Sequence, residues 1–200
     1  MAMVDNARCS QRPDFLSKPT LQGERVRLRA VVADDVPALL PMLRDVESTR
    51  LTGTHGDLLP DEAGIRTWYD TRRDQEDRLD LAVVEQVSGN VIGEAVLNAW
   101  DPGNESCSFR ICLTPGSYGQ GFGTEATQLI IGYGFERLGL HRISLEVYAF
   151  NPRARRVYEK VGFAAEGVLR DALLWENERV DAVVMSILAP EWFRHHGRPA

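Results

Sequence analysis

The chain has 200 residues, of which 44% are hydrophobic and 26% are charged, and its formal net charge is −6. This length and balance suit a single folded domain with a sizeable core and argue against a disordered chain. The acidic charge argues against a nucleic-acid surface, no apolar run approaches 18 residues, and no charged-then-apolar signal pattern opens the sequence. We therefore expect a cytoplasmic protein that binds neither nucleic acid nor membranes.

The first part of the chain predicts an arm, one strand and two helices. Residues 1–20 are polar and lack periodicity, which predicts a mobile N-terminal arm. Val26 and Leu28 alternate with arginines, as in a half-buried strand. The predicted elements are a strand over 21–30, a helix over 34–44, a turn-rich stretch over 52–60 and a helix over 61–77.

The remainder predicts mostly strands, interrupted by two helices. Ser88-Gly89-Asn90 predicts the turn of a hairpin between two apolar runs. The predicted strands are 79–87, 91–98, 107–113, 143–149, 168–175 and 179–188, and the helices are 123–138 and 152–161. In the element order, residues 191–200 are predicted to be a tail. In the division into domains, the folded domain covers 21–192 and the C-terminal tail covers 193–200. This order predicts a single domain of α/β class with a mixed sheet.

A glycine-rich stretch, Tyr118 to Ala126, separates the predicted strand at 107–113 from the helix that follows. Its sequence is Tyr-Gly-Gln-Gly-Phe-Gly-Thr-Glu-Ala. Glycines allow a ligand to approach the backbone, and the free N–H groups at a helix N-terminus attract anions, so a phosphate-bearing ligand is expected here. The dinucleotide fingerprint fails because Thr124 occupies its last glycine position, and a P-loop fails because Phe122 stands where lysine is required.

The glycine-rich stretch resembles the pyrophosphate loop of the GNAT superfamily of acetyl-CoA-dependent N-acetyltransferases. Tyr118 departs from the Arg or Gln that opens the superfamily pattern. A second block, from Asn151 through Tyr158-Glu159-Lys160 to Gly162-Phe163, resembles the second conserved block of the family. The aromatic Tyr118, the Gly-Thr-Glu-Ala continuation and the segments around residues 21–29 and 166–170 are similar to the RimJ/RimL branch, which modifies protein N-termini. The likeness spans about 21–192 and implies the GNAT fold.

The resemblance implies how acetyl-CoA is bound. The backbone of Ile111 to Leu113 would pair with the pantetheine arm, and Asn151 would hydrogen-bond that arm. Ala154 stands where many relatives have serine, so a hydroxyl contact is lost there. Arginines at 153, 155 and 156 are candidates for the CoA phosphates, with a solvated helix face as the alternative. The loop N–H groups that would hold the pyrophosphate belong to Gly119, Gln120, Gly121, Gly123 and Thr124.

Acetyl transfer to an amine requires a proton acceptor for the amine and a proton donor for the leaving thiolate. The resemblance assigns Tyr158 as the general acid, with ordinary core packing as the alternative. Glu146, twelve residues earlier, is the candidate general base, and Glu94 is its rival. His141 is expected to be structural.

The cysteines are not expected to take part in covalent catalysis. Cys9, Cys107 and Cys112 are an odd number without metal-ligand spacing, and neither Cys107 nor Cys112 has a histidine near it in sequence. We expect reduced thiols, direct acetyl transfer and no metal.

The favoured function is transfer of acetyl from acetyl-CoA to a protein N-terminal α-amine. Two alternatives stay open: acetylation of a small amine such as an amino acid, polyamine or antibiotic, and a non-catalytic acyl-CoA-binding module. An acidic pocket would favour a polyamine or antibiotic, and an open groove would favour a peptide. A homodimer is also left open.

Overall fold

The computed structural model describes residues 13–55 and 60–197, and the fold is built on one eight-stranded sheet. The strand order is β1-β2-β3-β4-β5-β6-β8-β7, and all neighbours are antiparallel except β5 and β6. This mixed sheet confirms the predicted fold class. The strands are β1 (Leu21–Gln22), β2 (Val26–Ala30), β3 (Leu79–Glu85), β4 (Val91–Asp101), β5 (Ser106–Leu113), β6 (Arg142–Tyr148), β7 (Ala164–Trp175) and β8 (Glu178–Leu188).

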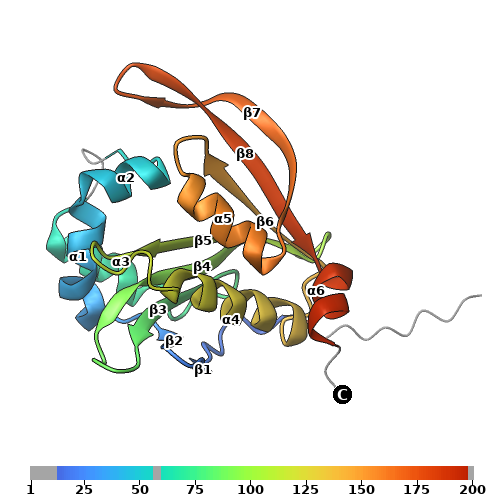
Figure 1. Ribbon diagram of the computed structural model, residues 1–200. Helices are drawn as coiled ribbons and strands as arrows, with labels where there is room; N and C mark the ends of the chain where they lie inside the picture. The colour runs from blue at the N-terminus through green and yellow to red at the C-terminus, as the bar shows by residue number, and fades with distance from the viewer. Residues whose placement is uncertain (1–12, 56–59, 198–200) are drawn as a thin grey trace, which may run out of the picture.

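Helices cover both faces of the sheet (Figure 1). The buried residues of α4, α5 and α6 belong to the larger core cluster, and those of α1 and α3 belong to a second cluster on the other face. None of the helices within the described ranges has the length and apolar composition needed to cross a membrane. The helices are η1 (Ala33–Asp35), α1 (Val36–Arg44), α2 (Val46–Thr52), α3 (Glu62–Asp70), α4 (Phe122–Glu136), α5 (Pro152–Val161) and α6 (Ala189–His196).

Strand β3 shows why both faces need a covering layer. Leu79, Leu81 and Val83 enter the larger cluster, while Ala82 and Val84 enter the second cluster. Successive strand residues point to opposite faces, so a continuous apolar run indicates a strand buried on both sides.

The N-terminal part of the chain differs from the prediction in two places. The strand expected over 21–30 is broken into β1 and β2 by a turn in which Gly23 N donates to Val26 O (2.9 Å). Residues 1–12 of the predicted mobile arm lie outside the described residues, but Phe15 is only 1% exposed and its ring contacts Trp100. The arm prediction is therefore wrong for the residues around Phe15, because an apolar side chain there fills a gap in the core.

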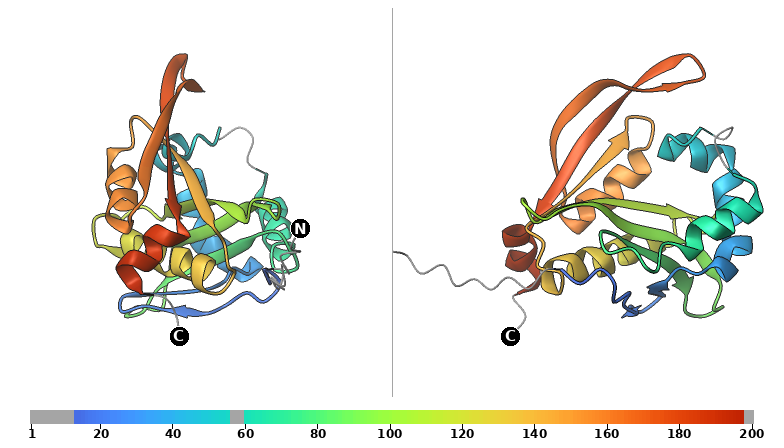
Figure 2. Two further views of the ribbon diagram at one scale, coloured as in Figure 1. Left: turned by 90° about the vertical axis from the view of Figure 1, so that its right-hand side faces the viewer. Right: turned by 180° about the vertical axis from the view of Figure 1, so that it is seen from behind.

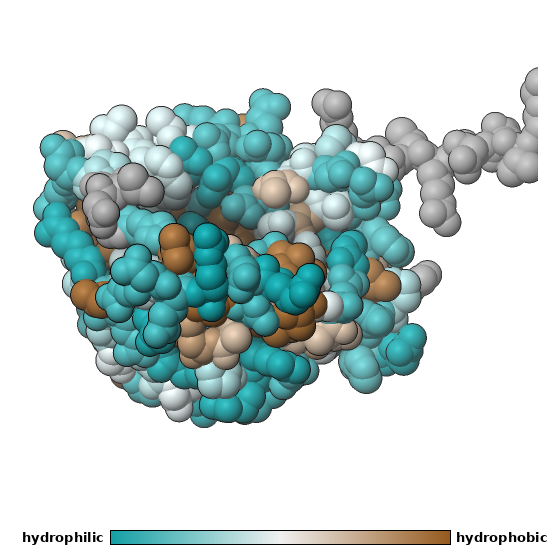
Figure 3. Space-filling view, turned by 90° about the horizontal axis from the view of Figure 1, so that it is seen from above, coloured by the Kyte–Doolittle hydropathy of each residue, from teal (hydrophilic) through white to brown (hydrophobic). Residues whose placement is uncertain are grey.

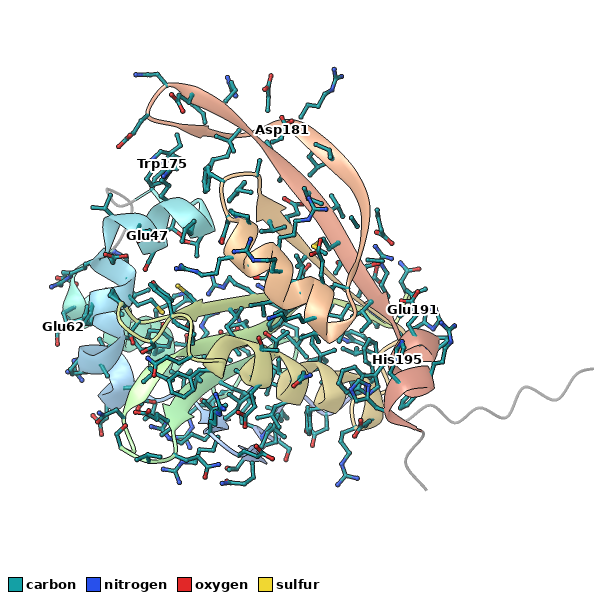
Figure 4. All side chains as sticks on the ribbon, in the orientation of Figure 1. Glu47, Glu62, Trp175, Asp181, Glu191 and His195 are labelled. Carbon is teal, nitrogen blue, oxygen red and sulfur yellow. The ribbon has the colours of Figure 1, made fainter. Side chains whose placement is uncertain are left out.

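The predicted tail over 191–200 is also wrong where the structure describes it. Helix α6, on which Figure 4 labels Glu191 and His195, extends to His196, and its Trp192 is buried against the larger core. The indole nitrogen of Trp192 donates to Glu136 Oε1 at 2.9 Å. The buried Trp192 therefore anchors this segment, with Ala189 and Phe193 packed against the same cluster.

Several element boundaries shift. Helix α3 ends at Asp70, well short of 77, and β3 ends at Glu85, because Val87 lies in the turn with its side chain 95% exposed. Strand β7 begins at Ala164, four residues earlier than predicted, and forms with β8 a long hairpin that projects beyond the rest of the molecule (Figure 2).

The feature that positions the site is the separation of β5 from β6. These parallel strands pair at Ser106–Arg142, Cys107–Ile143 and Ser108–Ser144, and their register extends no further. Beyond those pairs the two strands diverge, with α5 beside the opening (Figure 1).

Candidate active site

A cavity of about 690 Å³ lies where β5 and β6 separate. Both strands, α2, the glycine-rich turn and α5 line it. Apolar side chains gather in the middle of the face seen in Figure 3, surrounded by hydrophilic ones. The cavity thus brings together the glycine-rich turn and α5, which belong to sequence blocks about thirty residues apart.

The backbone of β5 presents hydrogen-bonding groups to this cavity. In an antiparallel ladder, hydrogen-bonded pairs alternate with non-bonded pairs. Thr114 N donates to Ile92 O (2.8 Å), so in the β4–β5 register the bonded residues of β5 are the even-numbered ones. Ile111 and Leu113 therefore direct their N–H and C=O groups toward the edge that β6 leaves uncovered.

The glycine-rich turn adopts the backbone conformation that its composition predicts. Gly119 and Gly121 have φ angles of 76° and 87°, in the left-handed region that favours glycine, and Gly121 caps the N-terminus of α4. A Cβ at Gly119 would meet no atom within 4 Å, so open space faces the backbone there. The N–H groups of the first turn of α4 have no partners within the helix, so this geometry suits an anion.

Two interactions anchor the turn to the β1–β2 connection. Arg25 donates from Nη1 to the carbonyl of Gln120 (2.8 Å). The Glu125 carboxylate accepts from the backbone N–H groups of Glu24 and Arg25. The turn is therefore fixed from a part of the chain nearly one hundred residues away, which the local motif does not reveal.

Tyr118 connects the turn to three other elements. Its hydroxyl donates to Leu113 O (3.1 Å) and lies 2.9 Å from Ser48 Oγ on α2. The Arg153 guanidinium of α5 lies 4.0 Å from the centre of its ring. Burial raises the pKa of Tyr118, which keeps the hydroxyl protonated as a donor. Tyr118 thus links β5, α2 and α5 through its hydroxyl and its ring.

Tyr158 lies on α5 with its side chain 7% exposed and lines the cavity. Its ring makes an edge contact with Phe109, with centroids 6.1 Å apart. Among the described residues the Tyr158 hydroxyl has no hydrogen-bond partner. Every fully buried side-chain polar atom of these residues does have a partner, so the hydroxyl is not fully buried. The hydroxyl must therefore reach the cavity. Burial raises the pKa of Tyr158, with the neighbouring Cys112 thiol as the second cause.

The two candidate bases occupy different environments. Glu146 on β6 is exposed and lines the large cavity, and its carboxylate makes no hydrogen bond or ion pair within the described chain. Glu94 on β4 is 4% exposed and does not line that cavity. Its Oε1 accepts from Arg110 (2.9 Å) and its Oε2 from the Tyr69 hydroxyl (2.7 Å). Both oxygens of Glu94 are thus engaged.

The remaining expected ligand residues differ in placement. Asn151 lines the cavity, but its Oδ1 accepts from Ala154 N (3.1 Å) as the N-cap of α5. Gln120 does not line the cavity, and its side chain donates to Gly116 O. The lining includes the other predicted cofactor-binding residues Ile111, Leu113, Gly119, Gly121, Gly123 and Thr124.

Of the arginines expected near the CoA phosphates, two line the cavity and one does not. Arg153 and Arg156 line it, together with Lys160. Arg155 instead donates to Glu159 one helical turn away (2.9 Å). The predicted solvated-face alternative therefore fits Arg155 alone.

Helix α2 supplies residues that the sequence interpretation missed. Ser48 and Thr52 line the cavity from it. Asp45 caps its N-terminus by accepting from Ser48 N, and Gly53 ends it at φ 66°. The available signal was Asp45 and Gly53, eight positions apart on either side of Ser48, because these residue types mark helix ends.

Comparison with known proteins decides the family. A family model described as "Acetyltransferase (GNAT) domain" matches residues 25–164. The chain belongs to the GNAT acetyltransferase family. The matched range contains the glycine-rich turn, the separated strands and all of α5.

Relatives within the GNAT family include proteins with named acceptors. The uncharacterized N-acetyltransferase YoaA of Bacillus subtilis is 27% identical over 187 residues, covering 86% of this chain and 98% of that protein. Spermidine N(1)-acetyltransferase of Vibrio cholerae is 33% identical over 110 residues, covering 55% and 64%. The crystal structure of spermidine N-acetyltransferase from Vibrio cholerae in complex with CoA and spermine matches with a TM-score of 0.79 at 23% identity, covering 86% and 99%. The chain is thus an N-acetyltransferase with the GNAT fold.

Proposed function

We propose that this GNAT enzyme transfers the acetyl group of acetyl-CoA to a protein N-terminal α-amine. The observation that carries the choice of acceptor is the charge of the cavity walls. The large cavity has one acidic lining residue, Glu146, and four basic ones, Arg110, Arg153, Arg156 and Lys160. A polyamine carries several positive charges and needs unpaired carboxylates, whereas an α-amine needs only one proton acceptor.

The residues present fit acetyl-CoA. When bound, it supplies an acetyl group activated as a thioester. The N–H groups of the turn at Gly119–Thr124 would hold its pyrophosphate, and Arg153, Arg156 and Lys160 would offset the phosphate charge. The backbone groups of Ile111 and the N–H of Leu113 face the edge that β6 leaves uncovered and would pair with the pantetheine arm as a neighbouring strand does, while Leu113 O accepts from Tyr118.

Glu146 is the proposed general base and Tyr158 the proposed general acid. Glu146 is preferred to Glu94 because its carboxylate is free to accept a proton, while both Glu94 oxygens are already engaged. The Tyr158 hydroxyl would hold a proton at the cavity for the leaving sulfur, and its raised pKa keeps that proton in place. Cys112 is not a nucleophile in this scheme, because burial raises its pKa to about 12.

An α-amine also suits a single carboxylate base. Ordinary pKa values are about 7.8 for an α-amine and about 10.4 for lysine, so deprotonating lysine at neutral pH costs roughly 3.5 kcal/mol more. With an α-amine as the acceptor, an exposed carboxylate such as Glu146 has to offset only the smaller of these two deprotonation costs. The glycine-turn and 21–29 segments that are similar to the RimJ/RimL branch support the same acceptor.

Spermidine is the second candidate acceptor, favoured by the named spermidine acetyltransferases among the relatives. The deciding experiment measures CoA release with a thiol reagent, using peptides with free or acetyl-blocked N-termini and spermidine. Turnover of free but not blocked peptides supports the proposal. Turnover of spermidine alone overturns it.

A further inference from the structure

A second cavity of about 240 Å³ adjoins the first and is not needed for the donor. It lies between the sheet and the helices α1, α2 and α3, and Trp68 and Tyr69 of α3 contribute to its wall. The two cavities share Ser48, Thr52, Arg110 and Cys112 as lining residues, so they meet at β5 and α2.

The walls of the second cavity are mainly apolar. Met42, Leu43, Ile65 and Trp68 line it, all within or against the second core cluster. Its polar side chains other than Glu94 and Arg110 carry hydroxyls, the Cys112 thiol and the Trp68 indole N–H. Hydrocarbon bound there would gain the free energy of leaving water.

The two charged side chains of this cavity neutralise each other. Arg110 and Glu94 form an ion pair at 2.9 Å, and the other Glu94 oxygen accepts from Tyr69. A second ammonium group would therefore find no unpaired carboxylate in this wall, and an acidic side chain would meet a carboxylate. The cavity thus selects against charged substituents of either sign.

The meeting point of the cavities lies beside the proposed acid. Cys112 faces Glu94 across the β4–β5 ladder, and Cys112 and Tyr158 both line the large cavity. An amine held at this point would be next to Tyr158, with its substituent directed into the second cavity.

We infer that the second cavity holds an apolar side chain of the acceptor, so that the preferred substrate is a primary α-amine bearing an apolar substituent. This inference rests on the proposed function and specifies its substrate class. The size suits it, because a cavity of about 150 Å³ can hold benzene. A leucine, methionine or phenylalanine side chain at the acetylated residue therefore fits the chemistry of the wall.

The substrate test compares acceptors that differ only in the first side chain. Hexapeptides beginning with Leu, Met, Gly or Asp, and the matching amino-acid amides, are assayed with the wild-type chain at saturating acetyl-CoA. We expect kcat/KM for the Leu and Met acceptors to exceed that for Gly by about tenfold or more, as is usual for alkyl groups in apolar pockets. The peptide and amide arms distinguish a protein N-terminus from a free amino-acid derivative.

The variant test fills the second cavity. Leu43→Phe adds volume to its wall, and Leu40→Phe is the matched control, because Leu40 packs against the same core cluster without lining the cavity. Leu43→Phe is expected to lower kcat/KM for the Leu peptide about tenfold and to leave the Gly peptide within about twofold. Leu40→Phe should change neither, and thermal unfolding checks that both variants fold.

The outcomes separate the inference from the proposed function. Equal turnover of Leu, Gly and Asp acceptors by the wild-type chain overturns the inference and leaves α-amine acetylation standing, even where Leu43→Phe does not fold. An equal loss on Leu and Gly peptides in Leu43→Phe, with the Leu40→Phe control unaffected, also overturns it. Spermidine turnover without any α-amine turnover overturns the proposed function and the inference that rests on it.

Discussion

Replacing Tyr158 with phenylalanine tests the acid assignment most directly. The change removes only the hydroxyl, which has no hydrogen-bond partner among the described residues, so the ring contacts with Phe109 and Phe163 remain. We expect the free energy of unfolding to change by less than about 1 kcal/mol, because no internal hydrogen bond is lost. General acid catalysis contributes about 10²- to 10⁴-fold, so kcat should fall at least about 100-fold, or about 2.7 kcal/mol in the barrier.

The assay is thiol release at saturating acetyl-CoA and peptide, with Tyr133→Phe as the control. Tyr133 is half-buried on α4 and does not line the cavity. Because burial raises the pKa of Tyr158, the wild-type rate should show no alkaline decline from this group up to about pH 10, its ordinary value. A kcat within threefold of wild type in Tyr158→Phe, with the fold intact, would refute the assignment.

Three further variants test other parts of the molecule. Glu146→Gln should lower kcat/KM about 100-fold at pH 7, and the deficit should shrink above the α-amine pKa of about 7.8, as measured in a pH series. Arg25→Ala removes the bond to the glycine-rich turn and should raise KM for acetyl-CoA about fivefold with kcat little changed, equivalent to about 1 kcal/mol. Hydrogen bonds from Arg142 and Ser186 lower the pKa of Glu166 to about 2. The contribution of Glu166 to stability is thus present above the ordinary value of 4.5 and is lost as pH falls toward 2. Glu166→Gln should remove that part of the pH dependence, worth less than about 1 kcal/mol at this partly exposed pair, in urea titrations.

The sequence predicted the sheet because apolar periodicity is a local property. The run from Val91 and the turn at Gly89 are readable within a few residues, and both occur as expected. Short segments anchored by a buried aromatic were missed. Phe15 and Trp192 anchor segments with few other apolar residues, so no clear periodicity marks them.

The donor half of the site was readable for a similar reason. The glycine-rich turn and α5 are each a continuous stretch of sequence, and residues of both line the large cavity. The resemblance could therefore identify Gly119, Gly121 and Tyr158 as candidates from short stretches. Gln120 was predicted for its backbone N–H, and its side chain, which donates to Gly116 O, does not line the cavity.

The acceptor half depends on contacts between distant segments. Its cavity joins Leu43 of α1, Trp68 of α3 and Cys112 of β5, and the Glu94–Arg110–Tyr69 cluster forms only when β4, β5 and α3 are packed together. No motif marks such a set, since each member alone resembles ordinary core or a surface charge.

The same division explains why acetyl-CoA is easier to infer than the amine. In the proposed binding mode, backbone groups such as those of Gly121 and Ile111 would hold the pyrophosphate and the pantetheine arm, and the positions of these groups depend on turn geometry and strand separation. An acceptor is bound by side chains that can change one at a time without altering the fold. Substituting Leu43 should therefore change acceptor choice while KM for acetyl-CoA stays constant, and substituting Arg25 should do the reverse. If the Leu43 and Arg25 variants each changed both the acceptor preference and KM for acetyl-CoA, the two cavities would not act separately.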